Sequence, residues 1–296
     1  SGWPHGAFFG TATLIAKTLA DKGKEAQSVS MMVTGQTFAN MLGVPAGTLL
    51  SEMLSWRLAF AILAAWALMT MLLVIAWVPF VAPIKDAGIK GQFRFLTHAG
   101  PWFILMAAFC GNSGIFCWWS YVSPWLQKVG GWDSSLVPLL MVLAGFGMVI
   151  GGIAGGRLTD LWKPGATAGL SQAIATLGLL LVFFVPGNHV TTALLTFLIG
   201  FALFFNSSPQ QLLMVQAGEG GGELIAGAAV QIAFNFGNAV GSIVGGAALT
   251  ANTMNYHYTG LAGAPIALIA VIMLVTYSRR YETHTGATER MREVHV

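Results

Sequence analysis

The chain has 296 residues, of which 55% are hydrophobic and 8% are charged, and its formal net charge is +3. Soluble domains carry roughly 25% charged residues, so this composition excludes an ordinary soluble domain and indicates a chain embedded in a lipid bilayer. The two cysteines lie seven residues apart in one apolar run, which excludes a disulfide between them and a cysteine cage for a metal ion.

Apolar runs recur along the whole chain, and each approaches or exceeds the ~20 residues that a helix needs to cross a bilayer. The runs are continuous instead of alternating in units of ~10 residues, so they predict helices and not barrel strands. We therefore expect an all-α polytopic membrane protein with nine transmembrane helices. The runs are Trp3 to Ala20, Ser28 to Leu50, Leu58 to Pro79, Trp102 to Leu126, Leu136 to Ala154, Ala168 to Pro186, Thr191 to Ala217, Leu224 to Ala251 and Leu261 to Tyr277.

The basic residues divide unequally between the two sides of these runs. Only Arg57 and Lys128 fall on one side. Cytoplasmic loops carry an excess of Lys and Arg, so we expect the other side and the C-terminus to be cytoplasmic, in a bacterial inner membrane. No clustered basic surface with interleaved aromatics indicates nucleic-acid binding. The twelve basic residues on the expected cytoplasmic side are Lys17, Lys22, Lys24, Lys85, Lys90, Arg94, Arg157, Lys163, Arg279, Arg280, Arg290 and Arg292.

An internal repeat links the second run to the eighth. The amide pair Gln36 and Asn40 recurs as Gln231 and Asn235, 195 residues later. At almost the same offset, the stretch GAFF at 6–9 matches ALFF at 202–205. If the first three runs correspond to the last three, the middle three lack counterparts, which we expect before Ser1. The parent would then have two parallel six-helix halves, a plan known in secondary transporters.

Three local patterns resemble motifs of the major facilitator superfamily. GVPAG, with Gly43, Pro45 and Gly47, resembles the antiporter motif of proton-linked efflux members. SWR at 55–57 resembles the tryptophan-arginine pair of the drug-proton antiporter group. GRLTD, with Gly156 and Asp160, resembles a degenerate cytoplasmic loop motif of the family. The stretches WPHGAFFG, NMLGVPAGT and QIAFNFGNAVG are most similar to the arabinose efflux permease-like branch.

This resemblance implies a fold and a domain plan. The fold would be the major facilitator fold without its first three helices, so that helices 4 to 12 are present. Residues 1–80 would be the remainder of the N-terminal bundle, and 81–100 the cytoplasmic linker between bundles. The C-terminal six-helix bundle would span 101–279, and 280–296 would form a cytoplasmic tail.

The resemblance also implies an activity. We expect proton-coupled efflux of sugars or small drug-like compounds by alternating access, carried out by a monomer surrounded by membrane lipid. The proton is the expected coupling ion. The membrane-embedded acid and arginine usual in the family would lie in the absent helices. Within the nine runs, the only candidate to carry a proton is His5, in the first run.

Polar side chains within the apolar runs are the candidates for contact with the solute. Amides inside a membrane usually face protein or a water-filled cavity, and the family's helices five and eleven border the central cavity. The alternative is that these amides only hold neighbouring helices together, and that Trp119 to Trp125 form an interfacial aromatic belt, which we favour for Trp125. The candidates are Gln36, Asn40, Asn112, Phe116, Asn206, Gln210, Gln231 and Asn235, with Asn206 and Gln210 beside a proline that is expected to break the seventh run.

Small residues repeat every four positions in three of the runs. One stripe contains Gly35, Ala39, Gly43 and Gly47, and two further stripes are centred on Gly151 and Gly241. Such stripes let helices approach closely in lipid, so we expect close helix packing at all three. Pro45 is expected to bend its helix.

No catalytic motif is present. The sequence lacks HExxH and GxSxG, and the glycine-rich stretch 218–223 lacks the Lys and Ser/Thr of a phosphate loop. We therefore expect no enzyme activity, no cofactor and no metal. Two alternatives to a transporter stay open: an intramembrane enzyme or receptor, and a nonfunctional fragment whose amides are purely structural.

Overall fold

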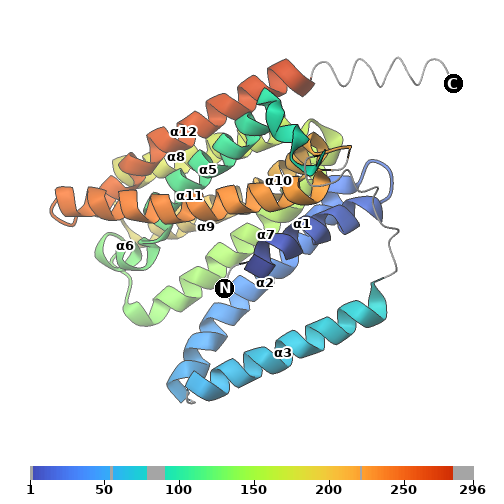
Figure 1. Cartoon of the computed structure of the whole chain (residues 1–296). Helices are drawn as coiled ribbons and strands as arrows, with labels where there is room; N and C mark the ends of the chain where they lie inside the picture. The colour runs from blue at the N-terminus through green and yellow to red at the C-terminus, as the bar shows by residue number, and fades with distance from the viewer. Residues whose placement is uncertain (1–2, 54–55, 79–90, 221, 283–296) are drawn as a thin grey trace.

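The computed structural model describes residues 3–53, 56–78, 91–220 and 222–282, and its described elements are all helices (Figure 1). Short 3-10 helices η1 (Arg94–Thr97) and η2 (Ser134–Leu136) precede α5 and α7, and a π-helical turn η3 (Ser278–Glu282) follows α12. The α-helices are α1 (Trp3–Thr18), α2 (Glu25–Met53), α3 (Trp56–Trp77), α5 (Ala99–Trp119), α6 (Val122–Lys128), α7 (Val137–Leu161), α8 (Pro164–Phe184), α9 (His189–Phe205), α10 (Ser207–Ala217), α11 (Glu223–Ala251) and α12 (His257–Tyr277).

Helices cover each apolar run, and this confirms the prediction of a helical membrane protein. Seven segments of the described chain are long and apolar enough to cross a bilayer, beginning at Phe60 in α3 and ending at Glu282 after α12. α1 and α2 are not among these seven. The run at 191–217 is interrupted at Asn206, between α9 and α10, as Pro209 predicts.

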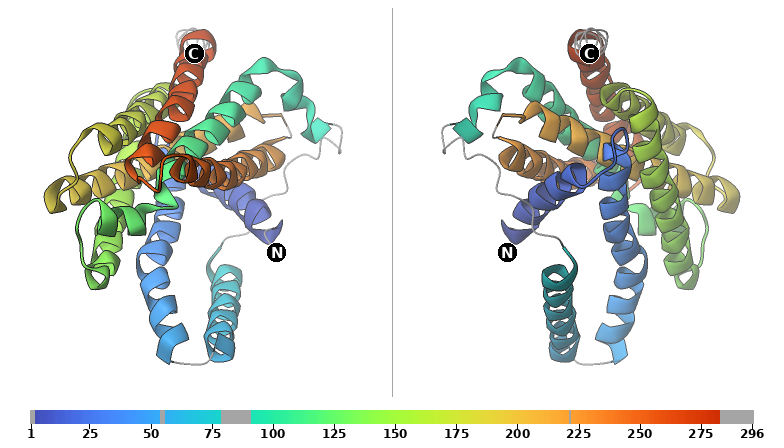
Figure 2. Two further views of the ribbon diagram at one scale, coloured as in Figure 1. Left: turned by 90° about the vertical axis from the view of Figure 1, so that its left-hand side faces the viewer. Right: turned by 90° about the vertical axis from the view of Figure 1, so that its right-hand side faces the viewer.

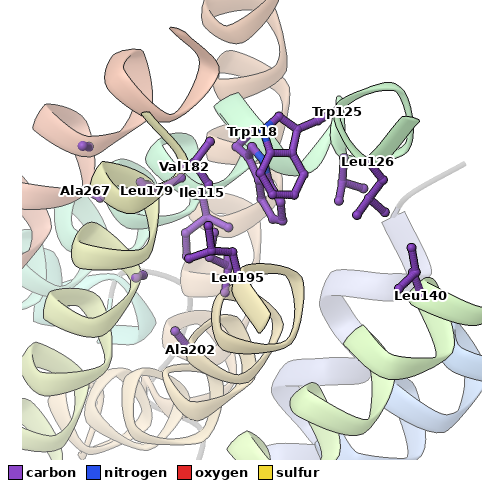
Figure 3. Packing of buried hydrophobic residues seen from close by; sticks show 14 of the residues in the cluster. Ile115, Trp118, Trp125, Leu126, Leu140, Leu179, Val182, Leu195, Ala202 and Ala267 are labelled. Atoms are coloured by element: carbon purple, nitrogen blue, oxygen red, sulfur yellow. The ribbon is translucent and has the colours of Figure 1, made fainter. Parts of the chain in front are cut away.

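The largest apolar core lies inside the bundle formed by α5 to α12 (Figure 3). Trp118 and Trp125 meet edge to face at its centre, with ring centroids 5.2 Å apart. Trp125 is only 1% exposed, so its assignment to an interfacial aromatic belt is wrong. The short helix α6 turns back after α5 and carries this indole into the core instead of toward the lipid headgroups.

Two of the glycine stripes bring helix backbones into contact, as predicted. A Cβ atom added at Gly151 would overlap the carbonyl oxygen of Phe201, which joins α7 to α9. A Cβ atom added at Gly241 would overlap the carbonyl oxygen of Ser113, which joins α11 to α5. Neighbouring glycines of both stripes make equivalent contacts one turn away. These positions therefore accept no side chain without separating the helices.

The stripe in α2 behaves differently from the other two. A Cβ atom added at Gly35 or Gly43 would meet no described atom within 4 Å, so none of the described helices packs closely on α2 at Gly43. The reason is that α2 contacts α7 near its N-terminal end, through Ala26 and Ser30. Pro45 and Gly47 lie outside the part of α2 whose surroundings are described.

The described helices form two groups, α1 to α3 and α5 to α12, which meet through a few pairs of helices. α1 packs on α11 and α2 packs on α7, whereas α3 lies beside α2 and away from the C-terminal helices (Figures 1 and 2). None of the membrane-spanning window of α3, Phe60–Trp77, is buried. The first group therefore contributes α1 and α2 to the interface between the groups, and α3 remains on the outside.

The described basic residues gather mainly at one end of the bundle, which we call the basic end. It holds the α1–α2 connection, η1, the α7–α8 connection and the end of α12, on the right in Figure 1. Arg57 lies at the start of α3 and Lys128 at the end of α6, and both helix ends lie on the left of Figure 1, away from the basic end, as the charge pattern predicts. The greater part of the predicted linker (79–90) and of the predicted tail (283–296) lies outside the described residues.

Candidate substrate cavity

One cavity of about 370 Å³ lies where the two groups of helices meet. Its wall combines α2 from the first group with α5, α7, α9, α10 and α11 from the second. The lining residues are Gln36, Asn112, Phe116, Trp119, Met141, Gly145, Met148, Leu203, Phe204, Ser207, Gln231, Phe234, Asn235 and Asn238. A cavity of this size, mostly apolar with a few polar groups, is typical of small-molecule sites.

The repeated amides of the sequence meet at this cavity. Gln36 reaches it from α2, and Gln231 and Asn235 reach it from α11. Gln231 is nearly buried and accepts a hydrogen bond of 2.9 Å from the Nε2 of Gln211. Asn235 donates through Nδ2 to the main-chain oxygen of Gln231, also at 2.9 Å. Asn235 is an exposed residue. The oxygen of the Asn235 amide is therefore available to a solute.

A second amide pair joins α5 to α11 at the same wall. Asn112 donates through Nδ2 to the Oδ1 of Asn238, at 2.9 Å. The Ser120 and Ser242 hydroxyls pair at 2.6 Å two turns further along α5, and Tyr121 donates to the Ser242 carbonyl at 2.8 Å. These hydrogen bonds fix the register of α5 against α11, so the positions of Asn112 and Asn238 at the cavity wall are held by both helices.

Asn238 is a cavity residue that the sequence reasoning missed. It lies three residues after Asn235 and seven after Gln231, which places all three on one face of a helix. The same spacing could have identified it. Trp119, considered above as part of an aromatic belt, lines the cavity instead.

Aromatic side chains supply most of the remaining wall. Phe116 and Trp119 come from α5, Phe204 from α9 and Phe234 from α11. No carboxylate, ammonium, guanidinium or imidazole group occurs among the described residues of the lining. The wall therefore offers neutral hydrogen-bonding groups beside flat apolar faces.

Two predicted cavity residues do not line it. Asn206 is 1% exposed and Gln210 is fully buried, while their neighbour Ser207 faces the cavity. Successive residues of a helix point about 100° apart, so a turn that presents Ser207 directs Asn206 and Gln210 into the surrounding helices. The side chain of Asn40 lies outside what the structure describes, although its backbone belongs to α2.

Contacts between the two groups of helices close the basic end. Lys17 of α1 forms an ion pair of 2.6 Å with Glu219, just before α11. A Cβ atom added at Gly227 would lie 2.9 Å from the Cα of Gly10, so α1 and α11 touch through their backbones. At the contact between α2 and α7, Gly156 of α7 faces Ser30 of α2 without room for a side chain.

Asp160 joins this closure by capping a helix of the other group. Its two carboxylate oxygens accept hydrogen bonds of 2.9 Å from the backbone N–H groups of Ala26 and Gln27, in the first turn of α2. The first N–H groups of a helix lack partners within the helix and carry partial positive charge. The loop motif of the sequence thus ends in Asp160, whose carboxylate accepts hydrogen bonds from the first N–H groups of α2.

We expect the substitution Asp160→Ala to loosen this end of α2. Removing a cap costs about 0.5–2 kcal/mol, so the amide protons of Ala26 and Gln27 should exchange with solvent roughly fivefold to tenfold faster. Hydrogen exchange followed by mass spectrometry of the peptide at residues 25–33 measures this change.

The matched control is Asp133→Ala at the other end of α7. Asp133 caps η2 in the same manner, accepting from the N–H of Ser135 at 2.9 Å. The Ser135 hydroxyl and N–H groups lower the pKa of Asp133. This variant should leave exchange at the start of α2 unchanged. Equal exchange in the Asp160→Ala variant and the unsubstituted protein would contradict the capping role.

Comparison with known proteins places the chain in a family. The family model of the Major Facilitator Superfamily matches residues 1–226. The Escherichia coli (strain K12) protein named "Putative transporter AraJ" is 38% identical over 279 residues, which cover 94% of this chain and 70% of the relative. "Inner membrane transport protein YdhP" of the same strain is 29% identical over 276 residues, or 93% of this chain and 70% of the relative.

Solved structures agree on the fold. The E. coli fucose:proton symporter FucP matches with a TM-score of 0.71 at 17% identity, over 92% of this chain and 73% of that chain. A bacterial homologue of the human lysosomal transporter Spinster, in an inward-facing conformation, matches with a TM-score of 0.51 at 15% identity, over 91% and 72% of the two chains. Because the family model covers most of the sequence and AraJ is 38% identical over nearly all of it, the chain belongs to the Major Facilitator Superfamily of membrane transporters.

Proposed function

We propose that this protein exports a small neutral solute through a cavity shared by its two groups of helices. The observation that carries the proposal is that Gln36 of one group and Gln231 and Asn235 of the other line the same cavity. A solute that bonds to both groups can couple its own binding to their relative movement. Rocking of two bundles about such a midplane site is the mechanism of many secondary transporters.

The chemistry of the wall supports sugars or small drug-like compounds as the solute. Hydroxyl groups of a solute can bond to the amide oxygen of Asn235 and to the amide of Gln36, and a flat apolar face can stack on Phe116 or Trp119. A neutral solute fits best, because no charged side chain among the described lining would balance an ionic one.

We assign the structure to a state closed at the basic end. The ion pair of Lys17 with Glu219 and the cap of Asp160 on α2 both lie there. Toward the other end of α2, no described atom lies within 4 Å of a Cβ atom added at Gly35 or Gly43. With the basic end in the cytoplasm, this is an outward-facing arrangement, and release of those contacts would open the cavity to the cytoplasm.

The remaining features of the proposal extend the family resemblance. The chain would supply helices 4 to 12 of a twelve-helix monomer in a bacterial inner membrane, with the C-terminus in the cytoplasm. Two observations support the assignment to helices 4 to 12. The membrane-spanning window of α3 is not buried by the described helices, and the chain spans 70% of AraJ. Residues 1–80 and 101–279 would form the two bundles, joined by 81–100, with 280–296 as the tail. The coupling ion would be the proton, carried by a group outside the described lining.

A flux experiment tests the proposal. Inverted membrane vesicles containing the full-length protein are given an imposed pH gradient and then a panel of solutes, including arabinose-type sugars, nucleosides and neutral or cationic drugs. At least one neutral member should dissipate the gradient and accumulate inside the vesicles, and vesicles lacking the protein should show neither change. Absence of flux for the whole panel would contradict transport. Uptake without proton movement would contradict only the coupling.

A further inference from the structure

A second cavity lies on the outer surface of the bundle, in a groove between α5 and α11. Its volume is about 390 Å³ and its wall is almost wholly apolar. Phe109 and Phe236 stack across the two helices with ring centroids 5.6 Å apart. This groove shares no residue with the substrate cavity, so it is a separate site. Its principal lining residues are Trp102, Met106 and Phe109 of α5 and Ile232, Ala233 and Phe236 of α11.

A polar cavity lies next to the groove along the same two helices. Its volume is about 210 Å³, and it is bounded by Arg94 and His98 before α5 and by Gly218, Glu219, Gly220 and Gly222 before α11. The indole of Trp102 lines the groove and donates to the Leu96 carbonyl oxygen of η1 at 2.8 Å, and the neighbouring Phe95 of η1 lines the polar cavity. The polar cavity therefore lies at the basic end and the apolar groove follows it into the membrane.

Among the described residues around the polar cavity, one cation lacks an acidic partner. Glu219 is the acid of its wall, and it is paired with Lys17 at 2.6 Å. Arg94 is exposed and has no ion pair with a described residue. A guanidinium group in this position suits a phosphate oxygen, which it can bind with two parallel hydrogen bonds.

We propose that α5 and α11 bind an anionic phospholipid, with its phosphate at Arg94 and an acyl chain in the groove. Two features on one helix pair support this occupant: a polar, cationic cavity at the membrane surface and an apolar channel that continues from it. Basic pockets between helices at the membrane surface bind anionic headgroups. Trp102, which is 51% exposed, lies between the two where interfacial tryptophans are found.

Native mass spectrometry of the full chain tests this site. The protein is released from detergent micelles that contain equal amounts of phosphatidylglycerol and phosphatidylcholine with identical acyl chains. It should retain phosphatidylglycerol preferentially. Arg94→Gln should lower that preference roughly fivefold, the effect of one basic side chain near the membrane surface. Ala233→Trp, which fills the groove, should lower retention of both lipids.

Two matched variants act as controls. Lys22→Gln removes an exposed cation at the same end, and Ile243→Trp adds an indole to an exposed position of α11 away from the groove. Both should retain lipid like the unsubstituted protein. Equal retention of the two lipids, or retention unchanged by both Arg94→Gln and Ala233→Trp, would overturn the proposal. A dimer that Ala233→Trp dissociates would also overturn it, because the groove would then bind a second copy of the chain.

Discussion

Replacing Asn235 by leucine should lower solute transport about tenfold while the protein still folds and inserts. The Asn235 side chain is exposed in the cavity, and its hydrogen bond goes to the backbone of its own helix. Its loss removes a neutral hydrogen-bonding group and leaves a polar group of the bound solute unpaired, which costs roughly 1–3 kcal/mol. About 1.4 kcal/mol corresponds to a factor of ten in transport efficiency. Initial rates of solute flux in inverted vesicles measure the change.

Asn252→Leu is the matched control for this substitution. Asn252 ends the same helix and donates in the same way to the carbonyl of Ala248, at 2.8 Å, but it does not line the cavity. Its variant should transport at the unsubstituted rate. If the Asn235 and Asn252 variants transported equally well at equal expression, Asn235 would have no role in solute binding.

Most of the helical architecture could be predicted from the apolar runs, because a bilayer allows few other structures for such segments. The runs placed the helices but not their ends. α7 continues to Leu161, seven residues beyond the predicted Ala154, because the polar end of the helix is held by the contact of Asp160 with α2. Apolar composition detects the part of a helix inside the bilayer and misses a polar extension that tertiary contacts stabilise.

Asn112 and Phe116, predicted outside the internal repeat, line the cavity, and two independent patterns agreed for the amides of α11. Gln231 and Asn235 carried both the helical spacing and the internal repeat, and both line the cavity with Gln36. The prediction that Asn206 and Gln210 line the cavity depended only on the expected break in the helix. A break shows that the helix is interrupted, but it does not determine how the following turn is rotated. That rotation depends on packing with neighbouring helices, which a single sequence does not reveal.

The glycine stripes show the same difference between a pattern and its surroundings. The stripes of α2 and α11 have the same four-residue spacing, yet Gly241 touches a neighbouring backbone, whereas no described atom lies within 4 Å of a Cβ atom added at Gly43. Spacing predicts a surface that permits close approach, whereas the partner helix determines whether the approach occurs. In α2 the partner α7 is met near the N-terminal end, at Ala26 and Ser30.

The same substitution at these two glycines should therefore have opposite effects on stability. In Gly241→Ala the added methyl group overlaps the carbonyl oxygen of Ser113, so α11 and α5 must separate. Overpacking of this kind costs about 1–3 kcal/mol. The apparent melting temperature should fall by roughly 5 °C or more, given that 1 kcal/mol shifts it by ~2–4 °C in chains of comparable size.

Gly43→Ala should leave the melting temperature unchanged or raise it slightly. The new methyl group meets open space, and alanine is favoured over glycine within a helix by about 1 kcal/mol. Both variants change one hydrogen to a methyl group in a long helix, so helix propensity affects them alike and only the neighbour differs. Thermal unfolding of the two purified proteins in the same detergent compares them directly. A fall at Gly43 as large as that at Gly241 would show that α2 packs closely on another helix through its own stripe.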